Sequence, residues 1–134
     1  GVAREERFPR KELNELLQWA DVVSIHSPLN AKTAGLIGKA ELETMKPTAI
    51  IINVARGGII DEAALADALN SDTIAGAALD VFSSEPLPAS PLYDLKDPDS
   101  LLASPHTAWA ADEAVKVLIE GVATNIKNFL LSLR

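Results

Sequence analysis

The sequence predicts an α/β fold: a parallel sheet with helices on both faces, followed by a long amphipathic helix. Two observations carry this prediction. Helix-like and strand-like segments alternate along the chain. The strand-like segments are also apolar along their whole length, where a half-exposed strand would be apolar at every second position. Such strands are typical of parallel sheets that are buried on both sides.

A helix and a strand are predicted first. Residues 9–21 are expected to be helical because four apolar side chains recur at helical spacing, namely Leu13, Leu16, Leu17 and Ala20. Residues 21–26, "DVVSIH", are rich in β-branched side chains, which favour a strand. Pro28 follows and blocks continuation of a central strand, so this strand is expected to end in a loop.

A second helix and strand come next. Residues 38–46 are rich in helix-forming side chains, and Pro47 ends that helix. Residues 48–55, "TAIIINVA", form a continuous apolar run, as expected of a strand that is buried on both faces. The "RGG" at residues 56–58 then breaks the strand.

The third helix opens with two acidic residues, whose charge suits a helix N-terminus, and spans residues 61–70. Residues 73–82, "TIAGAALDVF", are the next predicted strand. A proline-rich loop at residues 83–99 leads to a short last strand at residues 100–104. The amphipathic helix is predicted over residues 109–133, with one apolar stripe made of Val115, Leu118, Val122, Ile126, Phe129 and Leu133.

The composition argues against several classes of function. The chain has 134 residues, of which 48% are hydrophobic and 23% charged, as in one soluble globular unit. A net charge of −7 with no basic run argues against a nucleic-acid partner. The absence of cysteine excludes a thiolate nucleophile or a cysteine metal site, and it suits a cytoplasmic location. The apolar runs are too short to cross a bilayer, so no membrane contact is expected.

Polar or functional residues follow each predicted strand. Parallel strands bring their carboxyl ends to one edge of the sheet, where ligands bind in open α/β folds. The residues at these ends are His26, Ser27, Pro28, Asn53, Arg56, Asp80, Glu85, His106 and Thr107. We expect them to line one crevice, with His26 packed there or lining it without taking part in chemistry.

Three of these residues suit proton transfer. A carboxylate such as Glu85, placed beside His106, would favour the protonated ring of a residue that titrates near neutral pH. Arg56 in a glycine-rich turn offers a planar fork that matches a carboxylate. Together they predict proton transfer to or from a small anionic substrate with a carbonyl or hydroxyl group, provided that the three meet.

Each residue also has a purely structural explanation. His106 could lie at a helix entry or pack in the fold, Arg56 could form a surface ion pair, and Glu85 could be a charge in a loop. Asp80 could serve only to turn the strand end, and Ser27 could be a loop hydroxyl. Their joint occurrence is what favours a functional site.

Four segments resemble, in order and at family spacing, the second half of the D-isomer-specific 2-hydroxyacid dehydrogenases: "DVVSIHSPLNAKTAGLI", "MKPTAIIINVARGGIIDEAALADAL", "IAGAALDVFSSEP" and "SPHTAWA". The resemblance covers about residues 10–134. It implies a partial Rossmann-like parallel sheet with flanking helices. Residues 1–109 would form the second half of the NAD-binding domain, and residues 110–134 a C-terminal helix that packs on the substrate domain of the full enzyme.

The resemblance also implies roles for individual residues. Arg56 would hold the substrate's carboxylate and carbonyl oxygen, His106 would be the general acid and base, and Glu85 would pair with His106. The family's contacts with NAD or NADP map onto Ser27, Pro28, Val54, Ala55, Arg56, Asp80, His106, Thr107 and Ala108, with Asp80 at the nicotinamide carboxamide. No residue is implied as a metal ligand.

The implied reaction is the interconversion of a 2-oxo acid and a D-2-hydroxy acid. The segment "PHTAWAADEA", in which Trp109 follows the His-Thr-Ala step, resembles the glycerate dehydrogenase or hydroxypyruvate reductase branch of the family. This branch implies hydroxypyruvate or glyoxylate as the oxo acid, with D-glycerate or glycolate as the product. The family also implies a homodimer for the full-length enzyme.

The family's G-x-G-x-x-G loop and the acidic residue that contacts the ribose are absent from these 134 residues. We therefore expect a fragment that binds NAD weakly and has no turnover on its own. Two alternatives remain open. One is a non-catalytic nucleotide-binding relative of the corepressor type, and the other is a structural dimerisation module with an unpaired sheet edge.

Overall fold

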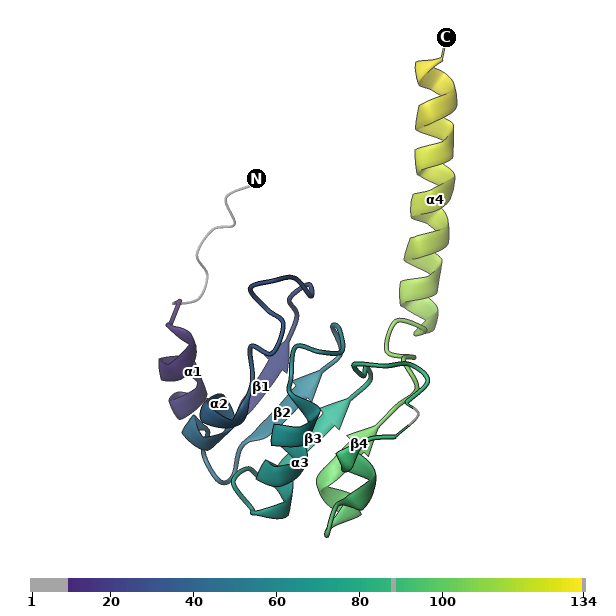
Figure 1. The fold of residues 1–134 in the computed structure, drawn as a ribbon. Coiled ribbons are helices and arrows are strands. Elements are labelled where there is room, and N and C mark those ends of the chain that lie inside the picture. The colour runs from purple at the N-terminus through teal and green to yellow at the C-terminus, as the bar shows by residue number, and fades with distance from the viewer. Residues whose placement is uncertain (1–9, 88, 134) are drawn as a thin grey trace.

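A four-stranded parallel sheet forms the centre of the computed structural model, which describes residues 10–87 and 89–133. Its strands are β1 (Val22–Ile25), β2 (Ile50–Asn53), β3 (Gly76–Leu79) and β4 (Leu101–Ala103), and their spatial order is the order of the chain. All neighbouring strands pair in parallel. Their carboxyl ends therefore lie along one edge of the sheet (Figure 1).

Four α-helices accompany the sheet: α1 (Leu13–Trp19), α2 (Lys39–Thr44), α3 (Glu62–Asn70) and α4 (Asp112–Ser132). Each predicted helix and strand is present, although each is shorter at its ends than the sequence pattern suggested. The predicted start of the first helix at residue 9 lies outside the described residues. Within the described ranges, no helix is long and apolar enough to cross a membrane.

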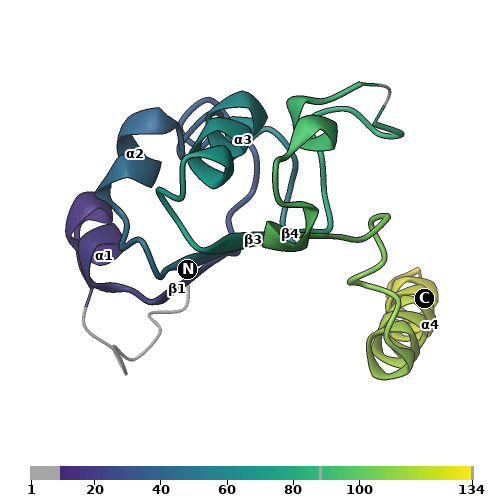
Figure 2. The same ribbon diagram turned by 90° about the horizontal axis from the view of Figure 1, so that it is seen from below.

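Helices cover only one face of the sheet. Figure 2 shows α1, α2 and α3 together on one side, whereas α4 stands away from the sheet on the other side. The prediction that both faces are covered is therefore wrong for the described part of the chain. The strands are nevertheless apolar on the open face, where Val22, Ile50 and Leu102 are exposed.

The hydrophobic core lies between the sheet and the three covering helices. Each helix contributes one leucine with no exposed surface: Leu17 from α1, Leu42 from α2 and Leu65 from α3. Ile51 of β2 is also fully buried in this core. Burial of one such side chain stabilises the fold by about 1.5–3 kcal/mol, so this layer fixes the strands whose ends carry the site.

The loop between β3 and β4 is more regular than the sequence predicted. It contains two short 3₁₀ helices, η1 (Pro91–Asp94) and η2 (Pro98–Ser100). Side chains cap both, because the Ser90 hydroxyl accepts from the Leu92 N–H and the Asp97 carboxylate accepts from the Asp99 N–H. Leu87 and Tyr93 of this loop line one cavity together with Leu101 and Ala103 of β4.

Candidate active site

The predicted site residues all lie beyond the carboxyl ends of the strands. They follow the four strands in order: Ser27 and Pro28 after β1; Val54, Ala55 and Arg56 after β2; Asp80 and Glu85 after β3; His106, Thr107 and Ala108 after β4. Asp80 is buried, His106 is half-buried, and Arg56 and Glu85 are exposed. The parallel sheet thus brings chain positions that are 80 residues apart to one edge.

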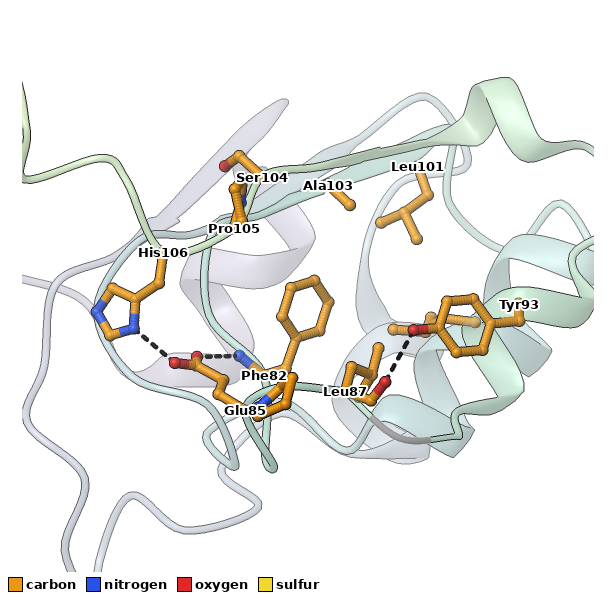
Figure 3. A pocket seen from close by; sticks show the side chains of 11 residues that line it. Phe82, Glu85, Leu87, Tyr93, Leu101, Ala103, Ser104, Pro105 and His106 are labelled. Atoms are coloured by element: carbon orange, nitrogen blue, oxygen red, sulfur yellow. Dashed lines mark hydrogen bonds and ion pairs between the residues drawn. The ribbon is translucent and has the colours of Figure 1, made fainter.

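Glu85 and His106 are in direct contact. Nδ1 of His106 lies 2.6 Å from Oε2 of Glu85, and Oε1 of Glu85 accepts a 2.9 Å hydrogen bond from the Phe82 N–H (Figure 3). The hydrogen bond with His106, with that of Phe82 second, lowers the pKa of Glu85. An ionised carboxylate can only accept, so Nδ1 carries the proton of this bond and Nε2 is the nitrogen free to exchange one.

A mostly apolar cavity of about 670 Å³ lies behind the pair. Its lining includes Phe82, Tyr93 and Leu101, together with Glu85 and His106 themselves. In Figure 3 the second ring nitrogen of His106 points away from Phe82 and Tyr93. Nε2 of His106 therefore faces away from this apolar wall.

The loop that carries Glu85 is held from two directions. Oε1 of Glu62, in the first turn of α3, accepts a 2.6 Å hydrogen bond from the Ser83 N–H. Gly57 approaches the same loop so closely that a Cβ there would lie 1.8 Å from the Phe82 carbonyl oxygen. Only glycine allows this approach between the turn after β2 and the loop after β3.

Asn53 shapes the turn that carries Arg56. It is 2% exposed, its Nδ2 donates to the Arg56 carbonyl at 2.9 Å, and its Oδ1 accepts from the Ala55 N–H at 3.1 Å. The sequence placed Asn53 at a strand end but assigned it no role. A polar residue that ends an otherwise apolar strand, three residues before the arginine, was the available signal.

Arg56 is not joined to the other two candidate residues. Its Nη1 donates to the Ala55 carbonyl at 2.7 Å. None of the hydrogen bonds and ion pairs found in residues 10–87 and 89–133 connects Arg56 with Glu85 or His106. A guanidinium has five N–H donors, so its fork retains donors for an anionic ligand. The structure thus assembles two of the three predicted residues directly.

Asp80 makes three hydrogen bonds with the segment that carries His106. Its Oδ1 accepts from the Ser104 hydroxyl at 2.6 Å and from the Thr107 N–H at 2.8 Å, and its Oδ2 accepts from the Ala108 N–H at 2.9 Å. Burial by itself would raise the pKa of Asp80, but these hydrogen bonds outweigh it and lower the pKa. The sequence pattern does not predict these contacts.

His26 forms a different kind of contact. Its Nε2 lies 2.8 Å from the Ser24 hydroxyl, and the residue is exposed. No carboxylate bonds to its ring among the described contacts. The two histidines therefore differ: within residues 10–87 and 89–133, only His106 has the carboxylate partner that suits acid–base chemistry.

The residues around the pair fit the nicotinamide half of a dinucleotide. Val54, which is 39% exposed, offers an apolar surface at the end of β2, and Oδ2 of Asp80 makes one hydrogen bond, so a lone pair remains for an amide N–H. The phosphate-binding loop expected of such folds is absent from the sequence. The residues at this edge therefore suit the nicotinamide end of the cofactor and not its pyrophosphate.

The parallel sheet, with its polar residues at the carboxyl edge, is similar in structure to the nucleotide-binding part of Rossmann-type dehydrogenases. Residues 2–108 match the family model of the D-isomer specific 2-hydroxyacid dehydrogenase, NAD binding domain, and the chain belongs to this family. The resemblance seen in the sequence is thereby confirmed.

Individual relatives agree with this assignment. The glycerate dehydrogenase of Methylorubrum extorquens is 40% identical over 119 residues, which are 89% of this chain and 38% of that protein. The glyoxylate reductase of Thermofilum pendens is 46% identical over 115 residues, which are 86% of this chain and 33% of that protein. The NAD-complexed D-isomer specific 2-hydroxyacid dehydrogenase of Lactobacillus delbrueckii ssp. bulgaricus is similar in structure, with a TM-score of 0.85, 28% identity, and coverage of 98% of this chain and 44% of that one. The chain thus spans less than half the length of these relatives.

Proposed function

We propose that the protein containing this chain is an NAD(P)-dependent dehydrogenase that interconverts a 2-oxo acid and a D-2-hydroxy acid. The observation that carries the proposal is the 2.6 Å contact between Nδ1 of His106 and Oε2 of Glu85 at the carboxyl edge of the sheet. The glycerate dehydrogenase and glyoxylate reductase among the relatives support hydroxypyruvate or glyoxylate as the oxo acid.

The residues of this chain would handle the proton and the substrate's carboxylate. Protonated His106 donates the proton on Nε2 to the carbonyl oxygen, while Glu85 stabilises the imidazolium through the Nδ1–H. In the reverse direction, neutral His106 accepts the hydroxyl proton at Nε2. Arg56 binds the carboxylate with N–H groups other than the one given to Ala55. The hydride for C2 comes from the reduced nicotinamide when the cofactor is bound.

The cofactor would lie along the carboxyl ends of the strands. We assign its contacts to Ser27, Pro28, Val54, Ala55, Arg56, Asp80, His106, Thr107 and Ala108. The pyrophosphate and ribose sites, and with them the choice between NAD and NADP, would come from residues outside these 134. The proposal also includes a cytoplasmic homodimer, and its support is the family resemblance.

Activity of the full-length protein tests this proposal. NADH and NADPH oxidation would be measured with hydroxypyruvate, glyoxylate and pyruvate, for the unchanged protein and for His106→Ala. The substitution should lower kcat by a factor on the order of 10²–10⁴, the usual contribution of a general acid–base residue. His26→Ala is the matched control, because among the described residues its ring bonds with Ser24 alone, and it should retain far more activity.

Two results would contradict the proposal. An unchanged kcat in His106→Ala would remove this residue from proton transfer. Absence of turnover by the unchanged protein with every oxo acid, despite tight NADH binding, would instead favour a non-catalytic nucleotide-binding role.

A further inference from the structure

The backbone at His106 adopts a conformation that non-glycine residues seldom take. Its φ is +55°, in the left-handed region, where the side chain approaches the backbone unfavourably. Such a residue persists only when its surroundings determine the conformation.

Contacts hold the backbone on both sides of His106. Before it, the Ser104 hydroxyl donates to Asp80 at 2.6 Å; after it, the N–H groups of Thr107 and Ala108 donate to the two oxygens of the same carboxylate. The indole N–H of Trp109 also donates to the His106 carbonyl at 2.8 Å. Within the part of the chain that the structure describes, Asp80 is thus the one side chain that bonds to the segment on both sides of the histidine.

Asp80 is itself rigidly placed. It follows β3 directly, it is 3% exposed, and its own N–H donates to the Asn53 carbonyl of β2 at 3.0 Å. Its carboxylate therefore belongs to the edge of the sheet, whereas its three partners belong to the loop after β4. Hydrogen bonds to a charged acceptor are roughly twice as strong as neutral ones, so this link is firm.

We propose that Asp80 is the positioning residue of the proton donor: by binding Ser104, Thr107 and Ala108 it fixes the left-handed turn at His106 and so the direction of the imidazole. This inference rests on the proposed role of His106. It adds to the contact with the carboxamide that the family resemblance implies for Asp80. The two roles differ in what they control, since positioning sets kcat and a carboxamide contact sets affinity for the cofactor.

Asp80→Asn in the full-length protein tests the inference. The amide keeps the size of the side chain, but its NH₂ group faces an N–H or hydroxyl donor and cannot accept. We expect kcat to fall about 100-fold, as a misplaced catalytic group causes, with a much smaller change in the KM for NADH. Hydrogen–deuterium exchange should become faster at the Thr107 and Ala108 amides and remain unchanged in β2.

A milder variant and a matched control accompany Asp80→Asn. Ser104→Ala removes one of the three bonds and should lower kcat about threefold, the effect of one hydrogen bond; it also keeps the test valid if Asp80→Asn does not fold. Asp61→Asn is the matched control, because Asp61 also accepts from two backbone N–H groups, those of Ala63 and Ala64, but at the start of α3. It should leave kcat and the exchange near His106 unchanged.

Unchanged exchange at Thr107 and Ala108 in both Asp80→Asn and Ser104→Ala would overturn the inference. A kcat of Asp80→Asn close to that of the unchanged protein would also overturn it. A large rise in the KM for NADH with kcat retained would also overturn it, in favour of a carboxamide contact alone. The exchange measurement does not depend on the substrate. Failure of the proposed dehydrogenase reaction, seen with His106→Ala, is therefore distinguishable from failure of the positioning role.

Discussion

The carboxylate of Glu85 links the pH dependence of stability to the candidate site. Its pKa lies below the ordinary value of 4.5, because the hydrogen bond with His106 favours the ionised form. A carboxyl group with a lowered pKa in the folded state stabilises the protein above its unfolded pKa. This contribution is lost as the pH falls through the lower folded value. Glu85→Gln should therefore be destabilising near pH 7, by an amount that shrinks below about pH 4.5.

Urea unfolding at pH 7, 5, 4 and 3 measures this difference. Glu43→Gln is a suitable control, because Glu43 forms an exposed 3.8 Å ion pair with Lys39 within α2. Exposed pairs of this kind contribute about 0–1 kcal/mol, so the control should change little at any pH. A Glu85→Gln effect that stays constant down to pH 3 would show that the carboxylate charge does not carry the interaction.

Asn53 allows a sharper test of the turn that carries Arg56. Asn53→Asp keeps the acceptor for the Ala55 N–H but places an oxygen against the Arg56 carbonyl, where Nδ2 donates now. A buried group left without its partner costs about 1–3 kcal/mol, and urea unfolding should show this loss. In the full-length protein the KM for the oxo acid should also rise, because the turn that presents the guanidinium is disturbed.

Asn30→Asp is the matched control for this change. The Oδ1 of Asn30 accepts from the Lys32 N–H at 2.8 Å in an exposed loop, and aspartate retains that acceptor. The control should have nearly the stability of the unchanged protein. Equal stability of the two variants would mean that donation by Asn53 contributes nothing to the turn.

The sequence predicted which residues lie at the candidate site, but it predicted few of the contacts that these residues make. The Glu85–His106 pair was foreseen as a possibility, because the residue types and the strand ends can be read from the pattern. The hydrogen bonds that Asn53 and Asp80 make within the fold were not foreseen. Both depend on which backbone N–H and C=O groups the turns leave facing a side chain, and only the folded loops determine that.

At the scale of elements, Gly57 controls how two loops pack. A Cβ at this position would lie 1.8 Å from a backbone oxygen of Phe82, which cannot rotate away as a side chain could. Gly57→Ala should therefore separate the turn after β2 from the loop after β3 and cost about 2–3 kcal/mol of stability. Because the second loop carries Glu85, turnover by the full-length protein should fall as well.

Gly121→Ala provides the same substitution without the clash. Gly121 lies within α4, and nothing comes within 4 Å of a Cβ built there. Alanine favours a helix over glycine by about 0.5–1 kcal/mol. Circular dichroism should thus show equal or greater helicity for Gly121→Ala and a lower unfolding midpoint for Gly57→Ala. Equal midpoints for the two variants would contradict the close approach of the loops.

The elements themselves were largely predictable from the sequence. Apolar runs, helical spacing and helix-forming composition identified the four strands and four α-helices of the described residues. The 3₁₀ helices at Pro91–Asp94 and Pro98–Ser100 were missed, because elements of three or four residues leave no periodicity to detect. The coverage of the sheet was predicted wrongly, because apolar strands show that a face suits burial and not which segment covers it.

For the whole molecule, the main feature is apolar surface that no described residue covers. On the sheet it comprises Val22, Ile50 and Leu102, and on α4 it includes Leu118, Val122, Ile126 and Phe129. No residue of α4 is buried. The described part of the chain thus has one well-packed layer, between the sheet and α1–α3, and a helix in which only Val115 is half-buried. We infer that the stability of the sheet does not depend on α4.

Deletion of residues 112–134 tests this independence. Because no residue of α4 is fully buried, the strands should keep their protection, and hydrogen–deuterium exchange in β2 and β3 should match that of the unchanged chain. Leu65→Ala, at a fully buried position in α3, should instead destabilise the core by about 2–5 kcal/mol and accelerate exchange in the same strands. Faster strand exchange after the deletion would show that α4 packs onto the sheet in solution. Retained protection would mean that the core between the sheet and α1–α3 is sufficient to stabilise the sheet, which carries Glu85 and Asp80 at its edge.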